Sequence, residues 1–176
     1  MPWKNGGGET TEVRTDPEGA GLEDFTWRLS AAHVARDGPF SPFPGIDRTL
    51  AVLSGDGLGL HVSGTEVRLA PGDAPFSFSG DAPTEGRLLG GPVEDLNIMT
   101  RRGAARHRMR RVMIEGGFFC SIDATTLLLF CAEGQVSAAG ETLAPRDTAV
   151  LEGKLGSHIQ VDGRGVLYVI GIEPAE

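Results

Sequence analysis

Glycine and proline recur along the whole chain and divide it into segments about as long as a single β-strand. The 176 residues include 26 glycines and 11 prolines. Between these breaks, several short apolar segments alternate with polar residues in the period of two that is typical of strands, whereas helical periodicity is nearly absent. The one weak helix candidate follows Asp37. This pattern predicts an all-β sandwich or barrel.

An internal repeat makes the prediction more specific. The segment Leu69–Ala74 recurs as Leu143–Thr148, and each copy follows an apolar strand, a glycine turn and a second strand. The proline of each copy presets the backbone of a turn, and the aspartate can accept hydrogen bonds from nearby amides. If the two turns did not arise by chance, the repeat predicts a cupin-type double β-barrel of the jelly-roll kind, a bicupin. We place an N-terminal barrel in 1–100 and a C-terminal barrel in 101–176, packed as one compact unit.

Length and composition are typical of a globular protein. A chain of this length buries enough surface to fold without disulfides or a metal ion. No apolar segment approaches the ~20 residues of a membrane helix, and the first residues carry no signal-peptide core. We therefore expect a cytoplasmic protein with no membrane partner, in which Cys120 and Cys131 are reduced and buried.

Charge is negative overall but unevenly spread. The net charge is −8, although residues 101–111 hold six arginines and no acid. The rest of the chain therefore carries 10 basic and 24 acidic residues, a balance of −14 that opposes nucleic-acid binding. Arg106, Arg108 and Arg110 alternate, which predicts a solvated edge strand. A docking surface for an acidic partner or subunit is the alternative.

Four stretches carry a family resemblance, in an order and spacing that cover nearly the whole chain. They are Trp3–Val13, Trp27–Ala32, Gly38–Arg48 and Asp95–Arg101. Together they resemble the HutD/Ves family. The resemblance implies a cupin-type double barrel, a link to bacterial histidine-utilisation genes (HutD) or stress responses (Ves), and no reaction established for the family as a class. Family members often carry a short stretch before the Trp-Lys-Asn motif, so the resemblance leaves the start of the chain open.

A metal site is not expected. Metal-binding cupins use a His-x-His pair with a nearby Glu and a later His, which bring nitrogen and oxygen ligands to one inward face. The four histidines of this chain are widely separated, and the segment at the position of the pair reads Phe43–Asp47. The alternative is a long-range cluster of His61 and His158, which the repeat puts in comparable regions. Covalent catalysis has no better support, because Ser54 lacks the Gly-x-Ser-x-Gly elbow. We predict no catalytic residue, no metal ligand and no cofactor.

An anion-binding site is the more attractive interpretation. Arginine grips a carboxylate through paired charge-assisted bonds, and asparagine offers both a donor and an acceptor to an amide or formyl group. On the strand 25–33, Arg28 and Ser30 point to one face, and Phe40, Phe43 and Pro44 are candidates for an apolar wall beside them. The predicted ligand-binding residues, each of which could instead be a surface, turn or ion-pair residue, are Lys4, Asn5, Arg28, Ser30, Phe43, Arg48, Asn97 and Arg101.

Three functions therefore remain open at this stage. The first is a non-catalytic binding or regulatory protein that senses a small anionic intermediate of histidine degradation, such as formylglutamate or urocanate. The second is a cupin-fold enzyme, a metal-assisted hydrolase or isomerase acting on a small carboxylate. The third is a regulatory partner protein that uses the arginine-rich strand. A homodimer is plausible for a cupin, although no interface is visible in the sequence.

Overall fold

The computed structural model describes residues 1–3, 6–121, 124–152 and 156–175, and every regular element in these ranges is a β-strand. The all-β prediction is confirmed, and the described residues include no helix of the length and apolarity that crossing a membrane requires. The weak helix prediction after Asp37 is wrong. Gly38–Pro39 forms strand β3, and the amide of Phe40 donates to the carbonyl of Thr84 at 2.9 Å. Prolines at 39, 42 and 44 explain why no helix forms here. Proline has no amide donor, and it restricts the residue before it to extended backbone.

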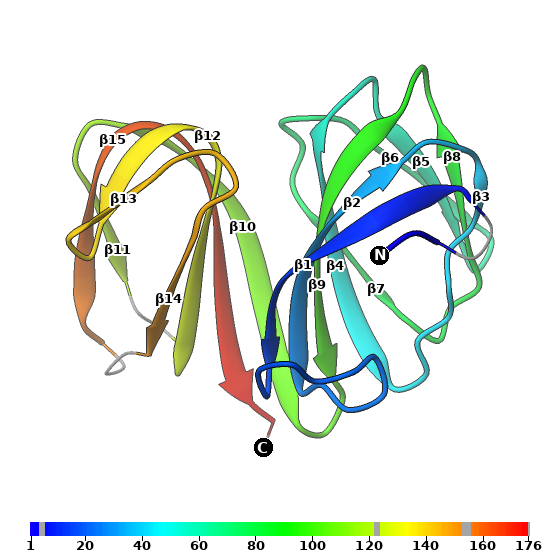
Figure 1. Cartoon of the computed structure of the whole chain (residues 1–176), viewed down its shortest axis with the longest axis horizontal. Helices are drawn as coiled ribbons and strands as arrows, with labels where there is room; N and C mark the ends of the chain where they lie inside the picture. Colours follow the sequence, from blue (N-terminus) through cyan, green and yellow to red (C-terminus); the bar gives the residue numbers. More distant parts are fainter. Residues whose placement is uncertain (4–5, 122–123, 153–155, 176) are drawn as a thin grey trace. The chain divides into compact units, whose positions relative to one another are not determined.

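The chain divides into two compact units, Met1–Ala105 and Arg106–Glu176, which are described separately. Unit 1 contains a five-stranded antiparallel sheet in the order β1-β2-β9-β4-β7 (Figure 1). Its central strand, β9, pairs along most of its length with β2 on one side and β4 on the other. These strands span Gly8–Asp16 (β1), Trp27–Val34 (β2), Ile46–Ser54 (β4), Phe76–Ser79 (β7) and Val93–Arg101 (β9).

A second sheet of unit 1 has four strands in the order β3-β8-β5-β6. It adds Leu58–Val62 (β5), Thr65–Leu69 (β6) and Thr84–Leu88 (β8) to β3. Leu58 and Leu60 of this sheet pack in one hydrophobic cluster with Leu50, Val52 and other residues of the five-stranded sheet. The two sheets thus enclose an apolar interior, and alternate residues of β2, β4 and β9 face into it.

Unit 2 is built around two long strands. Its six strands are Ala105–Glu115 (β10), Phe118–Ser121 (β11), Thr126–Ala138 (β12), Glu141–Leu143 (β13), Thr148–Glu152 (β14) and His158–Pro174 (β15), with β12 and β15 paired over most of their length. Strand β10 stands at one end of the order β10-β15-β12-β13, and Arg106, Arg108 and Arg110 are exposed on it. The prediction of a solvated edge strand is therefore confirmed.

The repeated segment forms the same turn in both units. In the first copy, Asp73 Oδ2 accepts a hydrogen bond from the amide of Ala70 at 2.8 Å, and in the second, Asp147 Oδ2 accepts one from Ala144 at 2.9 Å. The residue before each aspartate has a positive φ, +98° at Gly72 and +78° at Arg146. The predicted role of the aspartates is thus confirmed. The predicted closure into two barrels is not confirmed, because the strand pairings among the described residues define three sheets with free ends.

Candidate functional site

The inner face of the five-stranded sheet carries a group of polar side chains in an otherwise apolar interior. Arg28 on β2 lies opposite Met99 on β9, which lies opposite Arg48 on β4, so the two arginines share one face. Ser30 lies opposite Asn97 on the same face. We name this group the interior polar cluster. It consists of the buried residues Arg28, Ser30, Arg48, Asp95 and Asn97, together with Glu12 at its margin.

Arg28 is buried but has a charged partner. Its Nε donates to Glu12 Oε2 at 3.1 Å, and its Nη1 donates to Ser30 Oγ at 3.3 Å. The side chain of Arg28 is only 5% exposed, whereas that of Glu12 is 44% exposed. Glu12 comes from β1, which pairs with β2 and brings the carboxylate to the margin of the interior. The charge of Arg28 is therefore compensated within the sheet.

Arg48 is buried, and among the described residues no acid forms a hydrogen-bonded ion pair with it as Glu12 does with Arg28. Its guanidinium carbon lies 5.6, 5.3 and 5.1 Å from the ring centres of Phe40, Phe43 and Phe78, distances at which cation–π attraction operates. Its Nη1 reaches the carbonyl of Ser41 at 3.5 Å, and its Nε has no hydrogen-bond partner. Burial lowers the pKa of Arg48 to about 10, the charge of Asp95 opposes this change, and the charge of Arg28 adds to it. Arg48 still carries its proton at neutral pH.

Asp95 and Asn97 lie two residues apart on β9 and so share the inner face. Burial raises the pKa of the Asp95 carboxyl to about 7, against the attraction of Arg48. The side-chain oxygen of Asn97 is buried and has no hydrogen-bond partner. A buried polar atom without a partner costs about 1–3 kcal/mol. The cluster therefore holds one unfilled donor, on Arg48, and one unfilled acceptor, on Asn97.

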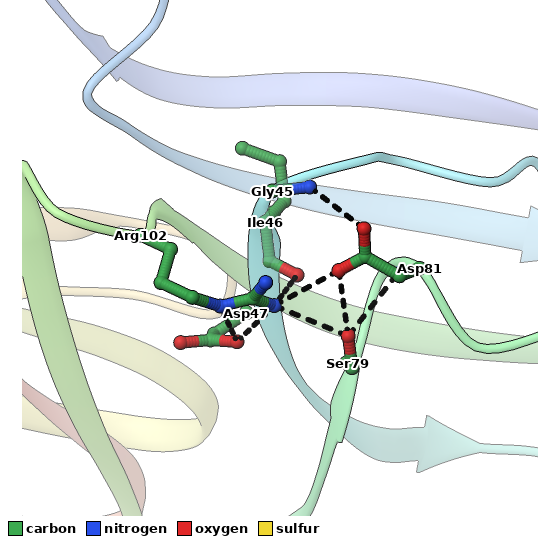
Figure 2. A network of polar contacts seen from close by, with 6 residues as sticks. All are labelled: Gly45, Ile46, Asp47, Ser79, Asp81 and Arg102. Carbon is green, nitrogen blue, oxygen red and sulfur yellow. Dashed lines mark hydrogen bonds and ion pairs between the residues drawn. The ribbon is translucent and has the colours of Figure 1, made fainter.

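A network of polar contacts fixes the segment that carries Phe43. Figure 2 shows Arg102 between Asp47 and Asp81, with its Nη2 at 2.8 Å from Asp47 Oδ1 and 3.0 Å from Asp81 Oδ2. Asp81 Oδ1 in turn accepts a hydrogen bond from the amide of Gly45 at 3.0 Å. The hydrogen bonds from the Gly45 amide, from the Ser79 hydroxyl and from Arg102, in order of decreasing effect, lower the pKa of Asp81 to about 2. Because Gly45 lies two residues from Phe43, the network anchors the backbone close to the residue whose ring packs against Arg48.

The backbone around Gly80 anchors the same segment. The amide of Phe43 donates to the carbonyl of Gly80 at 2.8 Å, and the amide of Gly80 donates to the carbonyl of Ile46 at 2.7 Å. A Cβ atom on Gly80 would lie 2.6 Å from the carbonyl oxygen of Phe43, which real Cβ atoms do not approach. Glycine is therefore required for this close approach of two backbones.

The structure brings five of the eight predicted site residues together. Arg28, Ser30, Arg48 and Asn97 belong to the interior polar cluster, and Phe43 packs on Arg48. Arg101 directs its guanidinium elsewhere, since its Nε and Nη2 donate to the carbonyls of Phe25 and Glu23 at 2.9 and 2.7 Å. Lys4 and Asn5 lie outside the described residues.

Sequence reasoning missed the two acids of the cluster. Asp95 stands in one of the family signatures, two residues before Asn97, so strand alternation could have placed it on the same face. Glu12 also lies in a signature, but its role depends on the pairing of β1 with β2. In the part of the chain that the structure describes, no three His, Cys, Asp or Glu side chains gather as a metal ion would require.

The fold and this site define a class of protein before any relative is considered: an all-β protein with a buried, arginine-containing polar cluster. The architecture agrees with that of a cupin 2 conserved barrel domain protein from Leptotrichia buccalis. The two structures superpose with a TM-score of 0.58 over 99% of this chain and 92% of that one, at 9% sequence identity. At this identity the likeness concerns the fold alone.

The chain belongs to the HutD family, whose model matches residues 1–169. An uncharacterised 21.2 kDa protein in the hutC 3′ region of Pseudomonas putida is 42% identical over 169 residues, covering 91% of this chain and 87% of that protein. Protein Ves of Citrobacter koseri is 38% identical over 109 residues, covering 61% and 56%. HutD from Pseudomonas fluorescens SBW25 superposes with a TM-score of 0.86 at 37% identity, covering 100% and 94%. The resemblance inferred from the four signatures is confirmed.

Proposed function

We propose that this chain is a non-catalytic binding protein of the HutD/Ves type that takes up a small carboxylate at the interior polar cluster and serves a regulatory role. Membership of the HutD family and the relative in the hutC 3′ region support a ligand from histidine degradation. Formylglutamate and urocanate are the candidates, because each carries a carboxylate together with an amide or imidazole group.

One observation carries the proposal: the Arg48 guanidinium is buried with its Nε unpaired. A buried charge is costly unless it is met by hydrogen bonds and an opposite charge. Arg28, on the same sheet face, has Glu12 for this purpose, whereas Arg48 is surrounded by three phenyl rings. A ligand carboxylate that meets Arg48 would supply the missing acceptor.

Asn97 supplies the second element of recognition. Its side-chain oxygen lacks a partner and lies on the strand next to that of Arg48, in a diagonal position on the same face. A ligand with an N–H donor near its carboxylate would fill both unpaired atoms at once. Formylglutamate has this arrangement in its amide, and urocanate has an imidazole N–H.

We also infer that the two units correspond to the two barrels of a bicupin, with the site in the first. The repeated Asx turn at Asp73 and Asp147 supports an ancient duplication. Two features support a site in unit 1: the interior polar cluster lies there, and the core of unit 2 around Leu127, Leu129 and Val169 is apolar.

Titration calorimetry with N-formyl-L-glutamate and urocanate tests the proposal. We expect binding to the unaltered protein and a loss of about 2–5 kcal/mol in Arg48→Met, since a desolvated ion pair is removed. Arg28→Met should also weaken binding, because it leaves Glu12 without its partner. Arg68→Met, at an arginine whose side chain is 74% exposed, is the matched control and should bind normally.

Two results would contradict the proposal. The first is unchanged affinity of Arg48→Met and Arg28→Met for the same ligand. The second is the absence of any rise in the melting temperature of the unaltered protein at millimolar ligand, because a ligand that binds only the folded state must stabilise it. If Arg48→Met unfolds the protein, Arg48 has a structural role and the melting experiment decides the proposal.

A further inference from the structure

The interior polar cluster contains an acid that the proposed binding of a carboxylate leaves unexplained. Asp95 is 2% exposed and lies on β9, opposite Ala32 of β2 and Val52 of β4. An acid is an unexpected neighbour for a carboxylate ligand, because two carboxylates at one site repel each other. Asp95 shares this inner face with Asn97, two residues along β9, and with Arg48, four residues along β4 from Val52, and its burial there requires a function of its own.

The other charged groups of the interior polar cluster come from three strands of the same sheet. Among the described residues, β1 contributes Glu12, β2 contributes Arg28, and β4 contributes Arg48. The facing sheet contributes apolar side chains such as Leu58 and Leu60. Because Glu12 already pairs with Arg28, Asp95 is the acid whose charge acts on Arg48.

A ligand carboxylate changes the net charge of the interior polar cluster. With Asp95 ionised, the two acids balance the two arginines and the cluster is neutral. An added monocarboxylate would then leave one uncompensated negative charge in a medium of low dielectric constant, which is costly. With Asp95 protonated the cluster carries +1, and the same carboxylate neutralises it.

We propose that Asp95 is a counter-ion that Arg48 exchanges for the carboxylate of the ligand, so that each carboxylate bound to the cluster is accompanied by one proton taken up from solvent. The proton resides on the Asp95 carboxyl, and no covalent bond other than this O–H is made or broken. The ligand thus binds as a carboxylate anion, and one proton binds with it at Asp95. This inference rests on the proposed function and adds the regulation of the same site by pH.

Two further observations support the exchange. Burial has already raised the pKa of Asp95 to about 7, so protonation near neutrality costs little, whereas Arg48 with a pKa of about 10 keeps its charge. A protonated Asp95 also gains an O–H donor, and the unfilled acceptor of Asn97 lies two residues away on the same face.

Calorimetric titration tests the inference with formate, a monocarboxylate, and with N-formyl-L-glutamate, of which one carboxylate enters the cluster and the second stays outside it. The carboxyls of both ligands stay ionised from pH 5.5 to 9. We expect the Kd to be nearly constant below pH 6 and to rise about tenfold for each pH unit above 7.5. Titrations in two buffers of different ionisation enthalpy should show an uptake of nearly one proton per ligand at pH 8.5 and little uptake at pH 5.5.

Asp95→Asn keeps the shape of a protonated Asp95 and removes its titration. It should bind at pH 8.5 about as tightly as at pH 6, with no proton uptake from this site. Asp24→Asn makes the same chemical change at an exposed carboxyl and should behave like the unaltered protein. Proton uptake that persists in Asp95→Asn, or a folded Asp95→Asn that no longer binds, would overturn the inference.

Failure of this inference and failure of the proposed function give different results. If the unaltered protein binds these carboxylates with a Kd that does not change between pH 6 and 8.5, the exchange is wrong and the proposed function stands. If it binds neither carboxylate at any pH, the proposed function is wrong and the exchange with it. If Asp95→Asn does not fold, the proton uptake of the unaltered protein decides.

Discussion

As the pH rises, the Asp95→Asn variant should gain stability relative to the unaltered protein. Asp95 is fully buried, and its pKa is raised from 3.8 to about 7 in the fold. The folded state therefore holds this proton more tightly than the unfolded state does. By linkage, the contribution of Asp95 to stability is largest below pH 4, falls between pH 4 and 7, and is constant above pH 7.

The size of the effect follows from the two pKa values. A difference of about 3 pH units at 1.36 kcal/mol each corresponds to about 4 kcal/mol in total, of which about 2.7 kcal/mol falls between pH 5 and 8. Relaxation around a buried charge reduces its cost. We therefore expect that the stability of Asp95→Asn relative to the unaltered protein changes by about 1–3 kcal/mol between pH 5 and 8, in favour of the variant.

Urea unfolding at pH 5, 6, 7 and 8 measures this difference for both proteins. Other titrating groups affect both proteins alike and cancel in the comparison, and Asp24→Asn controls for the loss of a carboxyl in general. A difference in unfolding free energy that is the same at all four pH values would refute the reasoning. A difference that moves in favour of the unaltered protein as the pH rises would show that Asp95 works as an ordinary ion-pair partner.

Three further predictions concern the parts of unit 1 that support the site. Leu60→Ala should lower the unfolding free energy by about 2–5 kcal/mol in urea, because this fully buried side chain leaves a cavity between the two sheets. The Asp81 carboxyl should titrate at about pH 2 in a carbon-13 NMR experiment, so that the Arg102 network is intact at neutral pH and is lost only as the pH falls from about 4 to 2; a midpoint near 4 would contradict the network. Gly80→Ala should lower both the melting temperature and the carboxylate affinity, since its Cβ would push the Phe43 segment away; unchanged values of both would show that the segment moves without cost.

Local patterns were sufficient to predict the fold class and the repeated turn. Strand alternation and turn chemistry are set by neighbouring residues, so the all-β fold and the hydrogen bonds of Asp73 and Asp147 could be predicted from sequence. The helix prediction after Asp37 failed for a local reason as well, because the prolines at 39, 42 and 44 oppose helical backbone.

The site could be predicted only in part, because its function depends on contacts between strands that are distant in sequence. Arg48 and Asn97 were chosen because arginine and asparagine suit an anionic ligand, but their unpaired atoms become apparent only once β4 and β9 are side by side. Arg101 has the same chemistry, yet it binds the carbonyls of Glu23 and Phe25, and nothing in its sequence neighbourhood distinguishes it from Arg48. The sequence gives no reason to assign Asp95 to an anion site, because an acid does not suggest one until its burial is known.

The most direct test of the account is to observe the Nε–H group of Arg48 by nitrogen-15 NMR while N-formyl-L-glutamate is added at pH 6. Arg28 is an internal reference, since its Nε already donates to Glu12. The account predicts that the Arg48 Nε–H resonance shifts in a saturable manner and becomes protected from exchange with water, whereas the Arg28 resonance changes little. An Arg48 resonance that stays in place while the ligand saturates the protein would contradict it.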